Sequence, residues 1–199
     1  MKKILWVLPI LFGFLLYHYF SAPEIKNAHP TGENIICFGD SLTFGTGASQ
    51  GMDYPSQLSN MISRPVWNKG VPGDTTARAL TRLEQDILEP RIVLITLGGN
   101  DLKNGVPKET AFQNLKIIVE SIQAQGALVI IGGIDLPFWG RGYGEAYEQL
   151  CKETGVVLIP NILDGIMGNR QLMSDSIHPN DAGYTIMAER FFRELKPYL

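Results

Sequence analysis

The strongest constraint on the fold is a series of five short apolar runs that alternate with segments of helical periodicity. The runs are NIICF (34–38), PVWN (65–68), RIVLITLGG (91–99), ALVIIGG (127–133) and VVLIP (156–160). All except PVWN, the weakest of them, are almost uninterruptedly apolar. Such runs are typical of a parallel sheet that helices cover on both faces. The pattern therefore predicts five strands of one parallel sheet.

The intervening segments predict the helices that cover this sheet. The last segment places five apolar residues on one face with a period near 3.6, namely Tyr184, Ala188, Phe191, Phe192 and Leu195. A second stripe, which Gly126 ends, consists of Phe112, Leu115, Val119 and Ile122. Helices are also expected over 74–88 and around 142–154. This alternation predicts a flavodoxin-like three-layer α/β/α sandwich with a central five-stranded parallel sheet and right-handed crossovers.

Length and composition limit the chain to one ordinary domain. It has 199 residues, of which 45% are hydrophobic and 19% charged, and this excludes a disordered chain. Without Lys2 and Lys3, the remaining 15 basic and 20 acidic residues give a net charge of −5, so no nucleic-acid partner is expected. Two cysteines exclude a disulfide-rich scaffold. We expect Cys37 and Cys151 to be small buried side chains, although export would permit a disulfide.

The amino terminus has the pattern of an export or anchor segment. Lys2 and Lys3 precede 17 residues without Asp, Glu, Lys or Arg, 4–20. Cleavage after Ala22 would place Phe20 at the −3 position, where a small residue is needed, so an uncleaved anchor is slightly favoured over a cleaved signal. We predict a signal peptide or membrane anchor over 1–22, a tether over 23–33 and one domain over 34–199. The domain is then periplasmic or otherwise extracytoplasmic, and its membrane contact is through this segment.

Four polar or glycine-rich clusters follow the predicted strands or precede the last helix. They are Gly39–Thr43, Asn68–Thr75, Gly98–Asp101 and Asp175–Pro179. In an open α/β sheet, ligands bind at the carboxyl ends of the strands. The sequence therefore predicts a functional site on that rim.

The clusters contain the residue types of a serine nucleophile and its base. A serine hydroxyl needs a base within hydrogen-bond reach, and His178 is the only histidine of the predicted domain. Asp175 lies three residues earlier, on the same side of a turn, where its carboxylate can orient the imidazole. Ser41 follows the first strand in Gly-Asp-Ser-Leu; a turn or helix-capping serine is the simpler alternative. This motif departs from the Gly-x-Ser-x-Gly elbow of α/β-hydrolases.

Two further residues can stabilise an oxyanion. Gly73 can bring its backbone N–H close to a substrate, and Asn100 offers a side-chain amide from the end of the central strand. Ordinary turn chemistry explains each of them equally well when it is taken alone. We expect Asp40 and Asp101 to brace the loops rather than to take part in chemistry.

The four clusters together resemble the conserved blocks of the GDSL, or SGNH, hydrolase superfamily. They read GDSLT at 39–43, NKGVPGDT at 68–75, GGND at 98–101 and DSIHP at 175–179, and the resemblance covers roughly residues 34–198. It is closest to the bacterial periplasmic thioesterase/protease/lysophospholipase branch, which is often labelled arylesterase. LPFWGRGYGEAY at 136–147 also resembles that branch.

The resemblance implies an ester or thioester hydrolase with Ser41 as nucleophile, His178 as base and Asp175 as the residue that orients it. It also implies an oxyanion hole formed by the backbone N–H groups of Ser41 and Gly73 and the side chain of Asn100. Two departures concern substrate choice. The helix that follows Tyr143 looks a few residues shorter than in that branch, and Phe138-Trp139 puts two aromatics where its acyl-pocket loop would lie.

The sequence indicates the substrate class less sharply than the reaction. An apolar acyl groove is one interpretation, and ordinary packing the other, of Pro137, Phe138, Trp139, Ile162, Ile166 and Met167. We take Pro137, Phe138 and Trp139 as the substrate-binding candidates and expect a small acyl-ester or lipid substrate and a monomer. No cofactor or metal is expected: Asp40, Asp175 and His178 could ligate one ion, but no HxH or CxxC spacing supports this.

Three other functions are alternatives to ester hydrolysis. A carbohydrate or cell-wall O-deacetylase could use the same residues. A non-catalytic envelope binding protein has no need for a complete serine, histidine and oxyanion set. A nucleotide-binding module is disfavoured because GVPGDT lacks the lysine of a phosphate loop.

Overall fold

The computed structural model describes residues 24–135, 140 and 142–199. Its centre is a five-stranded, all-parallel sheet in the order β2-β1-β3-β4-β5. The strands are β1 (Asn34–Gly39), β2 (Val66–Gly70), β3 (Pro90–Thr96), β4 (Leu128–Gly132) and β5 (Val157–Ile159). All five predicted strands are confirmed. The weak pattern of PVWN reflects the position of β2 at the edge of the sheet, where Trp67 is exposed.

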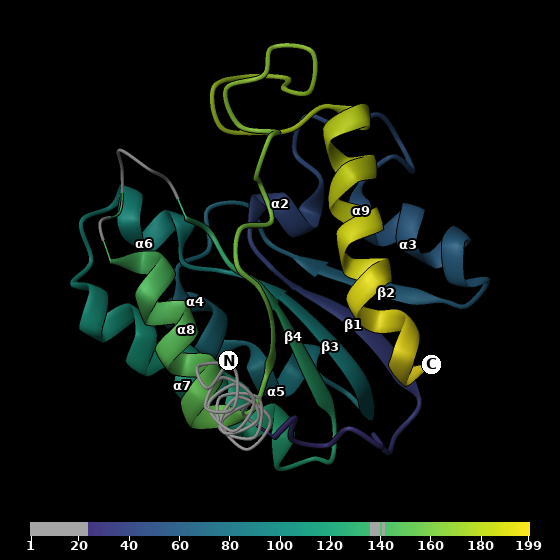
Figure 1. Cartoon of the computed structure of the whole chain (residues 1–199), viewed down its shortest axis with the longest axis vertical. Coiled ribbons are helices and arrows are strands. Elements are labelled where there is room, and N and C mark those ends of the chain that lie inside the picture. Colours follow the sequence, from purple (N-terminus) through teal and green to yellow (C-terminus); the bar gives the residue numbers. More distant parts are fainter. Residues whose placement is uncertain (1–23, 136–139, 141) are drawn as a thin grey trace, which may run out of the picture.

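Helices cover both faces of the sheet, as the three-layer prediction requires (Figure 1). The helices are α2 (Ser41–Phe44), α3 (Tyr54–Ile62), α4 (Thr76–Thr81), α5 (Leu83–Asp86), α6 (Gly99–Lys103), α7 (Lys108–Gln123), α8 (Tyr143–Thr154) and α9 (Asp181–Leu195), with the 3-10 turn η1 (Lys196–Tyr198). α3 and α9 pack together on one face, and α7 contacts α4 and α8 on the other. No helix within the described part of the chain is both long and apolar enough to span a membrane.

The core lies between the sheet and these two helical layers. The predicted stripe on α9 is buried at Tyr184, Ala188, Phe191 and Leu195, while Phe192 is only partly buried. The Phe191 ring stacks on Tyr54 of α3 with centroids 5.0 Å apart. Both cysteines are free thiols: Cys37 is buried in β1, and the Sγ of Cys151 donates to the carbonyl of Val156.

The helical segments differ from the prediction in two respects. The helix expected over 74–88 is two short helices, α4 and α5, which meet at Arg82. Arg82 there adopts φ −106° and ψ 3°, and its side chain turns toward the strand ends. The short helices α2, α3 and α6 were not predicted. α2 and α6 have four and five residues, too few for a periodic pattern.

The segment predicted to be a tether packs against the domain over the residues that the structure describes, 24–33. The backbone N–H of Lys26 donates to the carbonyl of Gly155 at 2.9 Å, and that of Thr31 to Gly126 at 3.2 Å. The Asn27 amide donates to two further carbonyls, those of Gln123 and Ala127. Gly126 and Gly155 precede β4 and β5, so this segment lies at the amino ends of these strands. The described part of the predicted tether, 24–33, is thus hydrogen-bonded to the domain, and the predicted signal or anchor over 1–22 lies outside the described residues.

Candidate active site

The turn after β1 presents Ser41 at the first position of α2. Asp40 caps this helix: its Oδ1 accepts a hydrogen bond from the Leu42 N–H at 3.0 Å. Gly39 leaves room for the turn, because a Cβ at this position would lie 2.3 Å from Thr43 Oγ1 and 2.4 Å from the Thr96 carbonyl oxygen. Thr43 also hydrogen-bonds the buried Tyr54 hydroxyl at 2.9 Å. Buried contacts therefore hold the turn that carries Ser41.

His178 and Asp175 reach Ser41 from the segment between β5 and α9, which lies next to α2 (Figure 1). The imidazole Nε2 lies 3.0 Å from the Ser41 Oγ, and Nδ1 lies 2.7 Å from Asp175 Oδ2. Asp175 Oδ1 accepts from the backbone N–H groups of Ile177 and His178 at 2.8 and 2.7 Å, which fixes the turn. The structure thus brings together three residues that the sequence predicted to converge, two of them 137 positions apart.

The charge on Asp175 suits this contact. Its pKa is lowered to about 2, mainly by the hydrogen bond with the His178 side chain and next by the Ile177 N–H. The Asp175 side chain is half exposed, so solvent screens the pair and its contribution to stability is small. An ionised Asp175 keeps the proton on Nδ1, which leaves Nε2 free to accept the serine proton.

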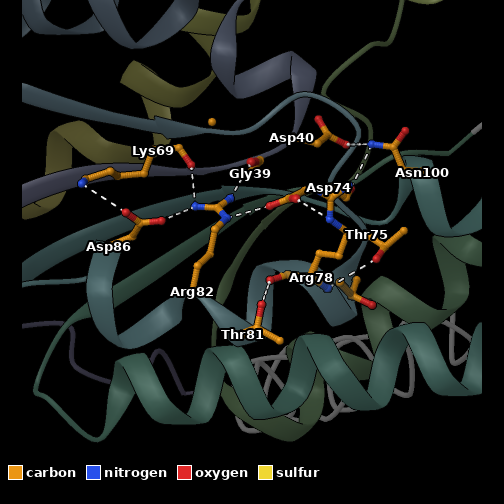
Figure 2. Close-up of polar contacts among 12 residues, drawn as sticks. Gly39, Asp40, Lys69, Asp74, Thr75, Arg78, Thr81, Arg82, Asp86 and Asn100 are labelled. Atoms are coloured by element: carbon orange, nitrogen blue, oxygen red, sulfur yellow. Dashed lines mark hydrogen bonds and ion pairs between the residues drawn. The ribbon is translucent and has the colours of Figure 1, made fainter.

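The Asn100 amide lies on the same rim, where α6 follows β3 (Figure 2). Its Nδ2 donates to Asp40 Oδ2 at 3.1 Å and to the Asp74 carbonyl at 2.9 Å. Both amide hydrogens are thus already engaged, and donation to a substrate requires Asn100 to exchange one of them. Gly73 immediately precedes Asp74, is exposed and has a φ of +80°, which favours glycine.

The two neighbouring aspartates brace the loops, as expected. Buried Asp101 accepts from the Thr76 N–H at 2.9 Å and from the Thr76 hydroxyl at 2.7 Å, and so ties α6 to the start of α4. Asp40 holds Leu42 and Asn100 in place. Within the described ranges, no group of three or more His, Cys, Asp or Glu side chains could hold a metal ion.

Burial raises the pKa of the Asp40 carboxyl group. Loss of solvent contact raises its pKa from 3.8 to about 7, the Leu42 N–H opposes this rise, and the charges of Asp74 and Asp101 add to it. The folded protein therefore keeps a proton on Asp40 at pH values where the unfolded chain has lost it. Stability from this group is complete below pH 3.8 and is lost as the pH rises to about 7.

We expect the Asp40→Asn variant to lose this dependence, because an amide does not titrate. Between about pH 4 and pH 7 each pH unit costs the wild type up to about 1.4 kcal/mol through Asp40, and the variant nothing through residue 40. Urea unfolding of both proteins at several pH values across this window measures the difference in slope. Asp164→Asn, at an exposed position, serves as the control. Parallel pH profiles for wild type and Asp40→Asn would contradict the assignment.

A cavity of about 320 Å³ opens beside Ser41 and His178. Its apolar wall consists of Leu42, Leu102, Ile134, Leu163, Met167 and Ile177, and Lys103 and Ser176 also line it. Of the predicted groove residues, Met167 lines the cavity. Ile162 and Ile166 do not, because they are fully buried in the core. The predicted Pro137, Phe138 and Trp139 lie outside the described residues.

Most residues of this apolar wall were not predicted from the sequence. Three of its residues lie next to motifs that were recognised: Leu42 follows Ser41, Leu102 follows Asp101, and Ile177 precedes His178. This adjacency was an available signal. Ile134 and Leu163 have no local signature, since the fold alone brings them to the cavity.

Comparisons with known proteins show the family to which this chain belongs. The GDSL-like lipase/acylhydrolase family matches residues 37–186. Thioesterase 1/protease 1/lysophospholipase L1 of Escherichia coli is 32% identical, over 96% of this chain and 93% of its own length. A crystal structure of TesA superposes with a TM-score of 0.79 at 30% identity, over 84% of this chain and all of its own. The esterase EstA of a Pseudoalteromonas species, solved with monoethylphosphonate as inhibitor, gives 0.71 at 28% identity, over 82% of this chain and 96% of its own. The chain belongs to the GDSL-like lipase/acylhydrolase family.

Proposed function

We propose that the chain hydrolyses carboxylic esters or thioesters through an acyl-enzyme on Ser41. The observation that carries this proposal is the continuous hydrogen-bonded series from Asp175 through His178 to the Ser41 hydroxyl, with separations of 2.7 and 3.0 Å. A serine with a base in contact, and a base oriented by a carboxylate, is the arrangement that activates a hydroxyl. The family membership supports the same reaction.

The geometry suggests the following steps. His178 Nε2 takes the proton as Ser41 Oγ attacks the carbonyl carbon, and a tetrahedral oxyanion forms. As this intermediate collapses, the imidazolium gives the proton to the departing alkoxide or thiolate, and the acyl group stays on Ser41. A water molecule then attacks the acyl carbon while His178 accepts its proton. Collapse of the second intermediate returns that proton to Ser41 and releases the acid.

Three donors are proposed for the oxyanion: the N–H groups of Ser41 and Gly73 and the Nδ2 of Asn100. Asn100 contributes by giving up its contact with Asp40 or with the Asp74 carbonyl when the negative oxygen forms. A charged acceptor favours this exchange over a neutral carbonyl, because hydrogen bonds to ions are roughly twice as strong.

We expect Asn100→Ala to lower kcat about 10²–10³-fold with little change in KM, since the lost donor acts mainly on the transition state. The substitution also leaves Asp40 Oδ2 and the Asp74 carbonyl without this donor, so the fold is checked by circular dichroism at the assay temperature. Asn104→Ala, one turn later and exposed, is the matched control. An unchanged kcat in folded Asn100→Ala would remove Asn100 from the oxyanion hole.

The apolar lining of the cavity suggests that it binds an apolar acyl or aryl group of the substrate. Six apolar side chains line it directly beside the Ser41 and His178 side chains. Initial rates on p-nitrophenyl and acyl-CoA esters of increasing chain length, with Ser41→Ala as the blank, test this. We expect a chain-length optimum longer than acetyl. Turnover of acetyl esters alone would favour the O-deacetylase, and no turnover of any ester would contradict the proposed function.

We also propose that the domain acts in the cell envelope. The support is the amino-terminal pattern of Lys2 and Lys3 followed by 17 residues without Asp, Glu, Lys or Arg. The mass of the mature protein, purified from cells, tests whether the segment is retained.

A further inference from the structure

Arg82 lies near the site, and its side chain is extensively hydrogen-bonded (Figure 2). It does not line the cavity. Its guanidinium donates to four acceptors: Asp74 Oδ2 through Nε at 2.6 Å, Asp86 Oδ2 and the Lys69 carbonyl through Nη1 at 2.6 and 3.0 Å, and the Gly39 carbonyl through Nη2 at 2.9 Å. The group also lies over the Phe38 ring, 4.2 Å from the centroid. The Arg82 side chain is only 16% exposed.

Two of these acceptors adjoin the backbone groups that the mechanism requires. Gly39 is separated from Ser41 by Asp40 alone, and its carbonyl also accepts from the Val71 N–H at 3.0 Å. Asp74 directly follows Gly73, and its carbonyl accepts from Asn100. One rigid, planar group thus joins the turn that carries the Ser41 N–H to the turn that carries the Gly73 N–H.

Two carboxylates, one buried and one partly buried, neutralise the charge of Arg82. Asp74 is almost fully buried, and its second contact, with Arg78 at 3.5 Å, comes from a side chain that is 65% exposed. Asp86 is 22% exposed and is also held by Lys69 at 3.2 Å. Arginine suits this place because its five N–H groups point in fixed directions, whereas lysine offers a single ammonium on a flexible stem.

We propose that Arg82 is the positioning residue of the oxyanion hole: by holding the Gly39 carbonyl and the Asp74 side chain on one guanidinium, it sets the separation of the Ser41 and Gly73 N–H groups. This inference rests on the proposed ester hydrolysis. Arg82 touches no reacting atom, so its effect passes through the two turns. A displacement of about 1 Å in such a group costs on the order of 10²-fold in rate.

The test compares Arg82→Lys with the wild type on a p-nitrophenyl ester of the preferred chain length. We expect kcat to fall about 10–100-fold while KM changes less than about threefold, because the misplaced donors act on the transition state. Affinity for an alkyl trifluoromethyl ketone, which forms a tetrahedral oxyanion on serine, should fall by the same factor as kcat/KM. Arg91→Lys is the control, since Arg91 is a partly buried arginine at the other end of the strands, where Nη1 donates to the Pro30 carbonyl.

A merely structural role predicts a different result. Folded Arg82→Lys, verified by circular dichroism at the assay temperature, would then show wild-type kcat and ketone affinity, and this overturns the proposal. If Arg82→Lys does not fold, Asp86→Ala frees the outer edge of the guanidinium and should lower kcat and ketone affinity together by at least about threefold. Lys69→Met, which removes only the other partner of Asp86, should leave both unchanged. Equal kinetics for Asp86→Ala and Lys69→Met would also overturn the proposal.

The two failures can be told apart by the activity of the wild type. If the proposed function is wrong, wild-type turnover does not exceed that of the Ser41→Ala blank. If only the Arg82 inference is wrong, the wild type is fully active.

Discussion

Ser41→Ala is expected to lower kcat for ester hydrolysis about 10⁴–10⁶-fold. The alanine variant keeps the cavity but lacks the oxygen that attacks the carbonyl, so the acyl-enzyme cannot form. The fold should persist, because the hydroxyl's side-chain partner is His178 and the turn is held instead by Asp40, Thr43 and Tyr54. Steady-state kinetics measure the loss, and labelling by a fluorophosphonate probe should disappear with it.

The matched control for this prediction is Ser176→Ala. Ser176 lines the same cavity and is therefore an alternative nucleophile. We expect Ser176→Ala to keep both turnover and labelling. Labelling that survives in Ser41→Ala and vanishes in Ser176→Ala would assign the nucleophile to Ser176 and contradict the mechanism.

The central sheet could be predicted from sequence because burial on both faces leaves a local mark. β1, β3 and β4 are almost completely buried, and their residues are almost uniformly apolar. α3 carried a local signal that was overlooked: Asp53 caps it, and Pro55 occupies its first turn.

Other features of the fold depend on contacts between distant residues. The break between α4 and α5 lies at Arg82, whose acceptor Gly39 is 43 positions away. The docking of residues 24–33 depends on the carbonyls of Gly126 and Gly155, which are far away in the sequence. Local periodicity carries no trace of either contact.

The same distinction applies to the site. Ser41, Asn100 and the Asp175–His178 turn follow or precede elements that are easily recognised, so the topology of the sheet already placed them on one rim. The sequence did not indicate that both Asn100 hydrogens are engaged, or that Arg82 lies beneath the two turns. Both features depend on the orientation of side chains in the folded protein, which the spacing of motifs does not predict.

His178→Ala is expected to lower kcat by about the same factor as Ser41→Ala, and the double variant should be no slower than either single one. The reason is that the two residues act as one unit: without a base the hydroxyl is a weak nucleophile, and without the hydroxyl the base has no proton to accept. His29→Ala, an exposed histidine in the docked segment 24–33, is the control and should retain full turnover. Kinetics of the wild type, the two single variants and the double variant on one ester measure the coupling between Ser41 and His178. A double variant whose loss equals the product of the single losses would mean that Ser41 and His178 act independently, and the 3.0 Å contact between them would then have no role in the chemistry.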